Sequence, residues 1–207
     1  MIIAVDGPTA SGKGTIAKAL ARHYGLPHLD TGLLYRAVGY QCFRDGGDPD
    51  DPSAALAATA FPDSLLENPA LRSEETGGLA SRVSVHPAVR QALFERQRAF
   101  ACQPGGAVLD GRDIGTVIAP EAEAKLFVVA SVKARAQRRF LEMQGRGDHV
   151  TLDEIEADLT QRDLRDSRRT TAPLIAAADA LALDTSTLSI ETAISAAIAL
   201  VERCRRK

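Results

Sequence analysis

Short apolar runs alternate along this chain with longer segments in which apolar residues recur every three or four positions. The runs are predicted to be strands, at residues 2–6, 26–30, 107–110, 125–130 and 180–184. The last segment is predicted to be a helix, because apolar side chains recur at helical spacing from Ile190 to Val201 and Ser189 can cap its start. Strands alternating with helices predict an α/β fold of three layers, with helices on both faces of a central, five-stranded, mainly parallel sheet.

Residues 45–100 interrupt this alternation, because they hold five of the ten prolines and many acidic residues before a helical pattern at 87–100. We interpret 45–100 as an insertion within a single domain that spans residues 1–207. A plain solvated loop over residues 45–80 is the alternative, although a loop of that length without secondary structure is unusual inside a compact domain.

The composition is that of an ordinary globular protein, with 45% apolar and 25% charged residues and a formal net charge of −2. A charge so close to neutrality argues against polymeric nucleic acid as a partner, whereas a small phosphorylated ligand needs only a local basic cluster. Cysteines and histidines are scattered, so we expect no disulfide framework and no zinc site, and we expect the histidines at the surface or in turns. Without a signal-peptide pattern or an apolar run of about 20 residues, we expect a cytoplasmic protein that does not bind membranes.

A glycine-rich segment, GPTASGKGT at residues 7–15, follows the first predicted strand and leads into a helical pattern that ends at Gly25. In this context the segment predicts a phosphate-binding loop, whose backbone N–H groups and helix N-terminus hold the phosphates of ATP. Lys13 would reach the β- and γ-phosphates, and the hydroxyl of Thr15 would face Mg²⁺. The predicted ATP-binding residues are Gly7, Pro8, Thr9, Ala10, Ser11, Gly12, Lys13, Gly14 and Thr15.

The loop departs from the general signature, because Gly14 follows Lys13 and the hydroxyl comes one position later, at Thr15. Two absences exclude a GTPase: no glycine has an aspartate three residues before it, and the single asparagine, Asn68, is not part of an NKxD motif. The Gly-Thr ending is similar to that of nucleoside monophosphate kinases.

Four further segments narrow the resemblance: LDTGLLYR (29–36), LRSEETGGLASRVSVHPAVR (71–90), LDGRDIGT (109–116) and RDLRDSRRTTAPL (162–174). Together with the loop they closely resemble the bacterial cytidylate kinase family, from residue 2 to about residue 200. The resemblance is weakest at 45–70, where many members carry a longer insertion with a small β-sheet. It implies a P-loop kinase fold, a monophosphate-binding insertion at 45–100, a helical lid at 145–172, a monomeric state, and transfer of the γ-phosphate of ATP to CMP or dCMP.

The resemblance also implies a set of substrate-binding residues. The predicted CMP-binding residues are Thr31, Tyr35, Arg36, Ser81, Arg90, Arg112, Asp113, Arg162, Asp166 and Arg169. Asp113, Arg90 and Ser81 are implied as the readers of the base, and the chemistry is suitable. A carboxylate accepts from the amino group of cytosine, and arginine or serine donates to its ring acceptors. For Asp113, an ion pair with Arg112 is the alternative.

The reaction itself requires little acid–base chemistry, because the phosphate oxygen of CMP is already a nucleophile. Positioning and charge stabilisation by arginines and Mg²⁺ are what it needs. We therefore predict a catalytic set of Lys13, Arg112, Arg162 and Arg169. Asp110 ends an apolar strand and is a candidate, with Thr15, for holding Mg²⁺ through water, or else for capping the turn.

The predicted lid begins with a capping box formed by Thr151 and Glu154. One helical face is then predicted to carry Ile155, Leu159, Arg162, Asp166 and Arg169. An ordinary salt-bridged helix is the alternative. Gly145 and Gly147 offer a hinge. Two other functions stay open on the sequence: a kinase of another small acceptor, such as UMP or a sugar, and a nucleotide-binding regulator without turnover.

Overall fold

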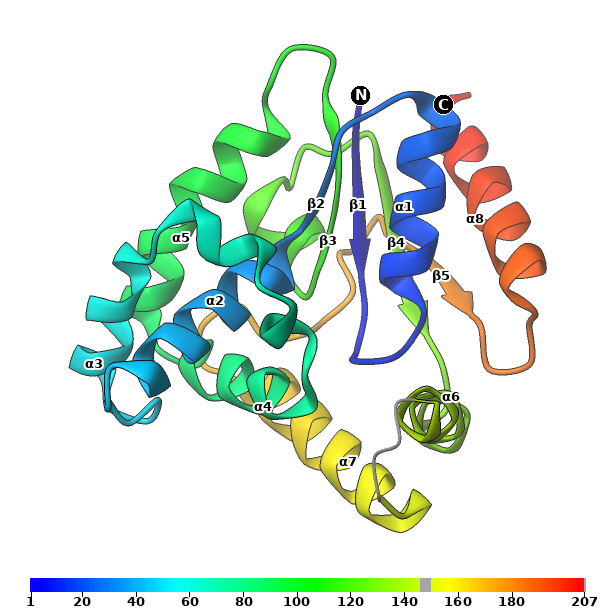
Figure 1. Cartoon of the computed structure of the whole chain (residues 1–207). Coiled ribbons are helices and arrows are strands. Elements are labelled where there is room, and N and C mark those ends of the chain that lie inside the picture. The colour runs from blue at the N-terminus through cyan, green and yellow to red at the C-terminus, as the bar shows by residue number, and fades with distance from the viewer. Residues whose placement is uncertain (146–149, 207) are drawn as a thin grey trace. The chain divides into compact units, whose positions relative to one another are not determined.

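The computed structural model describes residues 1–145 and 150–206, and its centre is a five-stranded parallel sheet (Figure 1). The strands lie in the order β2-β3-β1-β4-β5. Their bounds are β1 (Ile2–Asp6), β2 (His28–Asp30), β3 (Ala107–Gly111), β4 (Ala124–Val129) and β5 (Leu181–Asp184). All five predicted strands are confirmed, with ends that differ from the expected ones by no more than two residues.

The strand β1 lies at the centre of the sheet, paired in parallel with β3 on one side and with β4 on the other. Ile3, Ala4 and Val5 are completely buried, because both edges and both faces of the strand are covered. On one face, α1 (Lys13–Tyr24) and α8 (Ile190–Arg205) pack into a common core with β1, β4 and β5 (Figure 1). The predicted cap of α8 is confirmed, since the Ser189 side chain accepts from the Thr192 N–H group.

Contacts divide the chain into two compact units, one formed by residues 1–29 and 101–207 and the other by residues 30–100. The second unit contains α2 (Thr31–Arg44), α3 (Pro52–Ala57), α4 (Glu74–Val83) and α5 (Pro87–Ala101), with short helical turns at 58–60, 63–67 and 69–72. The alternative of a plain loop over 45–80 is therefore wrong, and the predicted helix at 87–100 is confirmed.

The helices α2 and α4 approach each other closely at Gly39. A Cβ atom at this position would lie only 2.8 Å from the backbone of Leu79, so a larger residue would force the two helices apart. Arg36 of α2 also holds the segment just before α4, because its Nη1 donates to the carbonyl oxygens of Leu71 and Ser73, at 2.8 Å each. The second unit thus has a well-defined helical core of its own.

The predicted lid corresponds mainly to α7 (Leu152–Arg168), which packs against α6 (Val132–Gln144). The capping box of Thr151 and Glu154 is confirmed. Four of the five residues predicted on one face are buried along α7; they are Ile155, Leu159, Arg162 and Asp166. Of the two predicted hinge glycines, Gly145 is the C-cap residue directly after α6, and Gly147 lies in 146–149, outside the described residues.

The fifth residue of that face, Arg169, does not lie in the helix as expected. The helix ends at Arg168, and Arg169 has extended backbone angles, with φ −56° and ψ 136°. The physical reason is a competing hydrogen bond: the N–H group of Leu174 takes the carbonyl oxygen of Asp166, at 2.9 Å, which a continuing helix would offer to residue 170. Arg169 is still buried, so the turn keeps its side chain beside the helix end.

No helix in the described part of the chain combines the length and the apolar character that crossing a membrane would require.

Candidate active site

The loop between β1 and α1 has an unusual backbone. Ala10 has φ +61°, a left-handed conformation that costs a residue with a side chain about 1–2 kcal/mol. The carbonyl groups on both sides of Ala10 are held by side chains. Thr9 O accepts from Arg135 Nη1, at 3.1 Å, and Ser11 O accepts from Thr185 Oγ1, at 2.9 Å. Tertiary contacts therefore hold the strained loop in place.

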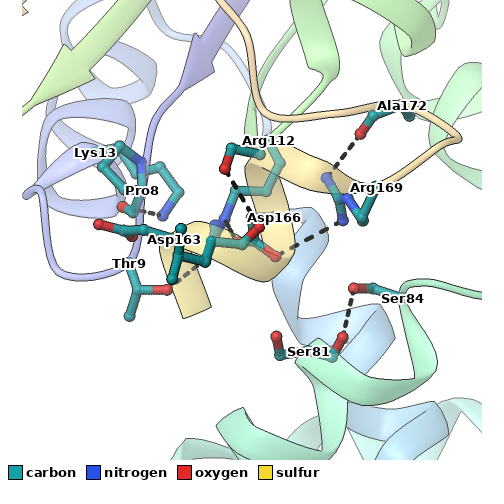
Figure 2. Close-up of polar contacts among 12 residues, drawn as sticks. Pro8, Thr9, Lys13, Ser81, Ser84, Arg112, Asp163, Asp166, Arg169 and Ala172 are labelled. Atoms are coloured by element: carbon teal, nitrogen blue, oxygen red, sulfur yellow. Dashed lines mark hydrogen bonds and ion pairs between the residues drawn. The ribbon is translucent and has the colours of Figure 1, made fainter. Parts of the chain in front are cut away.

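Close contacts also define the loop at its first residue, Gly7, and near its end, at Lys13. A Cβ atom at Gly7 would lie 2.1 Å from the carbonyl oxygen of Val128, so the residue there has to be glycine. Lys13 is the first residue of α1, and its ammonium group donates back across the loop to Pro8 O, at 3.3 Å (Figure 2). This places a mobile positive charge over the loop, next to the backbone groups that would meet phosphates.

Three of the predicted arginine and aspartate residues converge beside this loop. Arg112 donates from Nε to Asp166 Oδ2, at 2.8 Å, and from Nη2 to Thr9 Oγ1, at 2.6 Å (Figure 2). On its other oxygen, Asp166 lies 4.0 Å from Nη1 of Arg169. Burial by itself would raise the pKa of Asp166, but the charges of Arg112 and Arg169 outweigh it and lower the pKa below its usual value.

Arg162, another arginine of the predicted catalytic set, lies on α7, the helix that carries Asp166. It is buried and forms an ion pair with Asp158, one turn earlier, at 2.9 Å. The i,i+4 ion pair of the salt-bridged alternative is thus present on α7, but its arginine is buried and not solvated.

The carboxyl end of β3 brings Asp110 close to the phosphate loop. Asp110 is buried; its Oδ2 lies 3.6 Å from the position that a Cβ atom would take at Gly14, and its Oδ1 accepts from His28 Nε2, at 2.7 Å. The expectation for the histidines was wrong here, because His28 lies within β2 and contacts a candidate metal ligand. It was also wrong for His86, which is buried and donates to Pro49 O, at 2.8 Å.

Asp113 lies just after the same strand, at the start of a short turn, η4 (Ile114–Ile118). Its carbonyl oxygen accepts from the N–H groups of Val117 and Ile118, and its side chain is buried. Asp6, at the end of β1, stabilises this turn. Its carboxylate accepts from Ile114 N, at 2.9 Å, and from Gly115 N, at 2.8 Å. Burial raises the pKa of Asp6 to about 7, although these two hydrogen bonds oppose it.

Sequence reasoning did not assign Asp6 to the site. The signal that could have found it is its position as the last residue of the central strand, directly before the phosphate loop. Ligands of parallel sheets bind at this edge.

The second unit gathers the remaining predicted residues. The guanidinium of Arg90 lies 5.4 Å from the ring centroid of Tyr35, and its Nη1 donates to Ser84 O, at 3.3 Å. The hydroxyl of Ser84 in turn donates to Ser81 O, at 3.0 Å, so Ser84 belongs to the group although the sequence did not single it out. This unit holds five of the ten predicted CMP-binding residues; they are Thr31, Tyr35, Arg36, Ser81 and Arg90.

A cavity of about 390 Å³ opens beside the phosphate loop in the first unit. Its walls come from the loop, from Thr15 and Ile16 of α1, from α6, and from the segment between β5 and α8. Arg139 and Glu142 of α6 form an ion pair of 2.7 Å on one wall, while Leu188 and Ile190 make another wall apolar. A volume of this size, lined by apolar groups and a few polar ones, is typical of small-molecule sites.

The donors for a metal ion are few. Among the described residues, no group of three or more His, Cys, Asp or Glu side chains could together hold a metal ion. Thr15 and Asp110 are hard oxygen donors beside the loop, and Mg²⁺ in kinases is commonly held by one or two such groups together with substrate phosphates and water. The residues present fit that mode of binding.

A phosphate-binding loop after the central strand of a parallel sheet, faced by buried arginines, defines this chain as a P-loop protein. A family model described as cytidylate kinase matches residues 3–203. A cytidylate kinase of Caulobacter sp. (strain K31) is 56% identical over 207 residues, covering 100% of this chain and 96% of that protein. One of Xanthobacter autotrophicus is 55% identical over 205 residues, covering 99% of each. This chain belongs to the cytidylate kinase family.

The fold is also found in a solved structure. An uncharacterized protein from Eubacterium ventriosum superposes with a TM-score of 0.56 at 15% sequence identity, covering 98% of both chains. At that identity the similarity concerns the fold alone.

Proposed function

We propose that this protein transfers the γ-phosphate of ATP to CMP or dCMP, giving CDP or dCDP and ADP. The observation that carries the proposal is the contact of Arg112, which is paired with Asp166, with Thr9 of the phosphate loop, in a member of the cytidylate kinase family. These contacts bring an arginine within reach of the phosphates that the loop would hold.

On the donor side, the N–H groups of the loop and the N-terminus of α1 bind the phosphates of ATP, and Lys13 neutralises their charge. The cavity beside Thr15 and Ile16 takes the adenosine part of ATP. Its apolar wall suits a purine ring, and its position next to the loop matches the short distance between base and phosphates in a nucleotide.

On the acceptor side, the base is read by Asp113, Arg90 and Ser81. Asp113 is buried, so its carboxylate would form a charge-assisted hydrogen bond with the amino group of cytosine out of water. Thr31, Tyr35 and Arg36 bind the rest of CMP in the unit formed by residues 30–100. Asp166 orients the arginines.

The chemistry is an in-line displacement that needs charge stabilisation more than proton transfer. An oxygen of the CMP phosphate attacks the γ-phosphorus of ATP, the bond to the β-phosphate oxygen breaks, and ADP leaves. Lys13, Arg112, Arg162 and Arg169 surround the transferred group and stabilise its negative charge. Mg²⁺, held by Thr15 and through water by Asp110, would neutralise part of the charge on the β- and γ-phosphates.

The decisive experiment is an ADP-release assay with ATP and each of CMP, dCMP, UMP, AMP and GMP. We expect turnover with CMP and dCMP that exceeds turnover with the purine monophosphates. Preferred turnover of UMP would favour a different acceptor, and ATP binding without ADP release for any of the five would favour a regulator. The proposed monomeric state is checked separately, by light scattering of the purified chain.

A further inference from the structure

Arg135, on α6, contacts the phosphate loop, and most of the N–H groups of its guanidinium donate to protein groups. Its Nε donates to Ala130 O, at 3.0 Å, and its Nη1 donates to Thr9 O and to Asp163 Oδ1, at 3.1 Å each. Its Nη2 donates to Asp163 Oδ2. Four of the five N–H groups of this guanidinium are therefore used, and the residue is only 3% exposed.

An arginine in this state is poorly placed to bind phosphate directly. Its remaining donor capacity is small, and it would have to break its ion pair with the half-buried Asp163 before it could turn toward a ligand. Its contact with Thr9 O instead acts on the loop backbone, directly before the left-handed residue Ala10.

A second support acts on the other side of Ala10 and starts from the same helix. Arg138, three residues after Arg135, donates from Nη1 to Thr185 Oγ1, at 3.2 Å, and from Nη2 to Thr185 O. Thr185 Oγ1 then donates to Ser11 O. Both carbonyl groups that flank Ala10 are thus fixed from α6, one directly and one through Thr185.

The partner of Arg135 lies on the lid helix. Asp163 and Asp166 are three residues apart on α7, and each holds one arginine that also contacts Thr9. The pair of Asp163 and Arg135 leads to the carbonyl oxygen of Thr9, and the pair of Asp166 and Arg112 leads to its hydroxyl group. Thr9 is consequently the point at which α7 and the phosphate loop are joined twice.

We propose that Arg135 is a positioning residue for the phosphate loop and that Asp163 of the lid helix orients it. In this way, the conformation in which the loop accepts phosphates depends on a carboxylate of α7. The inference rests on the proposed function, because it assigns Arg135 to ATP binding without contact between Arg135 and ATP. It distinguishes Arg135 from Lys13, which would touch the phosphates.

If this is correct, removal of the Asp163 carboxylate should weaken the binding of ATP, the phosphate donor, and not the binding of CMP. Without the Asp163 carboxylate, the guanidinium of Arg135 loses its ion pair and becomes more mobile. The hydrogen bond from Arg135 to Thr9 O is then formed only part of the time, and Ala10 can leave its strained conformation. The N–H groups of the loop then have to be ordered again when phosphate binds. Binding of CMP in the absence of ATP does not use these contacts.

The test compares Asp163→Ala, Arg135→Gln and the double variant with wild type, using calorimetric binding of a non-hydrolysable ATP analogue and, separately, of CMP. Glu156→Gln, on the same helix and outside this set of contacts, is the matched control. We expect about tenfold weaker binding of the analogue in both single variants, no further loss in the double variant, and unchanged binding of CMP. Melting temperatures are recorded alongside, to confirm that each variant is folded at the temperature of the titration.

Two results would overturn the inference: binding of the analogue by Asp163→Ala within twofold of wild type, or losses that multiply in the double variant, since Arg135 would then act without Asp163. If Arg135→Gln does not fold, Asp163→Ala decides the question alone. A wild-type protein that fails to bind the analogue contradicts the proposed function, and the two failures are therefore distinguishable.

Discussion

Arg112 and Asp166 are 54 residues apart in the sequence, yet Nε of the first lies 2.8 Å from Oδ2 of the second. One residue follows the end of β3 and the other lies near the end of α7. Asp166 is shared, because Arg169 approaches its second oxygen. A single buried carboxylate therefore lies between two arginines that are proposed to stabilise the transferred phosphate.

Replacing Asp166 by Asn should destabilise the protein by about 3–5 kcal/mol, because removal of one partner leaves a buried arginine charge uncompensated. Since the pKa of Asp166 is lowered in the folded state, its stabilising effect is present above the usual carboxyl value of 3.8 and is lost only as pH falls through the lowered pKa. The difference in unfolding free energy between wild type and D166N, measured with urea, should be constant from about pH 5 to pH 8. A difference that changes within that range would contradict the assignment.

Asp6 should show the opposite pH dependence. Burial raises its folded-state pKa to about 7, from 3.8, so between these values the folded protein holds a proton that the unfolded chain has released. The stabilisation is present at low pH and is lost as pH rises through 7. The unfolding free energy of wild type relative to Asp6→Asn should therefore fall by about 2–3 kcal/mol between pH 5 and pH 8. Parallel pH profiles for the two proteins would show that Asp6 is already ionised at pH 5.

Lys13→Ala should reduce kcat by several orders of magnitude while the protein stays folded, because the ammonium group acts mainly on charge that develops in the transition state. Lys18→Ala, on the exposed side of the same helix, is the matched control and should keep wild-type turnover. Steady-state ADP release measures both variants. Near-normal turnover of a folded Lys13→Ala would remove Lys13 from the catalytic set.

Asp113→Ala should weaken discrimination between cytosine and uracil. Loss of one buried, charge-assisted hydrogen bond costs about 1.5–3 kcal/mol, so KM for CMP should rise about tenfold or more while KM for UMP changes less. Initial rates over a range of each monophosphate test this. If KM rose equally for both, Asp113 would not be reading the base.

Arg169→Ala should lower kcat/KM for CMP by about 100-fold or more, as expected for loss of an electrostatic stabiliser. Its neighbour Arg168 is exposed, so Arg168→Ala is a control that differs by one position and should change the rate little. A loss confined to ATP affinity, with kcat unchanged, would instead place Arg169 in ground-state binding.

Hydrogen exchange tests whether residues 150–172 act as a lid. The backbone of this segment should exchange quickly in the free protein and slowly with CMP and an ATP analogue together, because closure over both nucleotides excludes water. The helix α8, which packs against the central sheet, serves as the internal reference. Equal protection of residues 150–172 with and without ligands would mean that they form a fixed wall.

Local patterns predicted those features that depend on neighbouring residues. The strands, the cap at Ser189 and the capping box at Thr151 are of this kind, because apolar period and side-chain capping act over a few positions. The phosphate loop was equally visible, since its glycines and Lys13 occur together in one short segment. The roles of the arginines remain predictions, although Arg112, Asp166 and Arg169 do lie together.

Features that the sequence did not reveal join residues far apart in the chain. The contact between His28 and Asp110 depends on β2 lying beside β3, and strand order is not encoded in the apolar pattern of either strand. The ion pair of Arg135 and Asp163 connects α6 with α7, and its two residues are 28 positions apart in the chain. The helix end at Arg168 is a nearer case, because it coincides with a hydrogen bond from Leu174 N–H to Asp166 O in the turn that follows the helix, and the apolar pattern did not show that turn.

The central position of β1 has a consequence for how this chain is made. The strand is complete at Asp6, but its first sheet partner, β3, begins only at Ala107. At about 5–20 residues per second, a ribosome needs roughly 5–20 s to synthesise the intervening chain. During that interval an apolar strand has no sheet to join, whereas the contacts within residues 30–100 are already available to form. The helical unit is therefore expected to fold first on the ribosome, and the phosphate loop to take shape only after β3 and β4 have emerged.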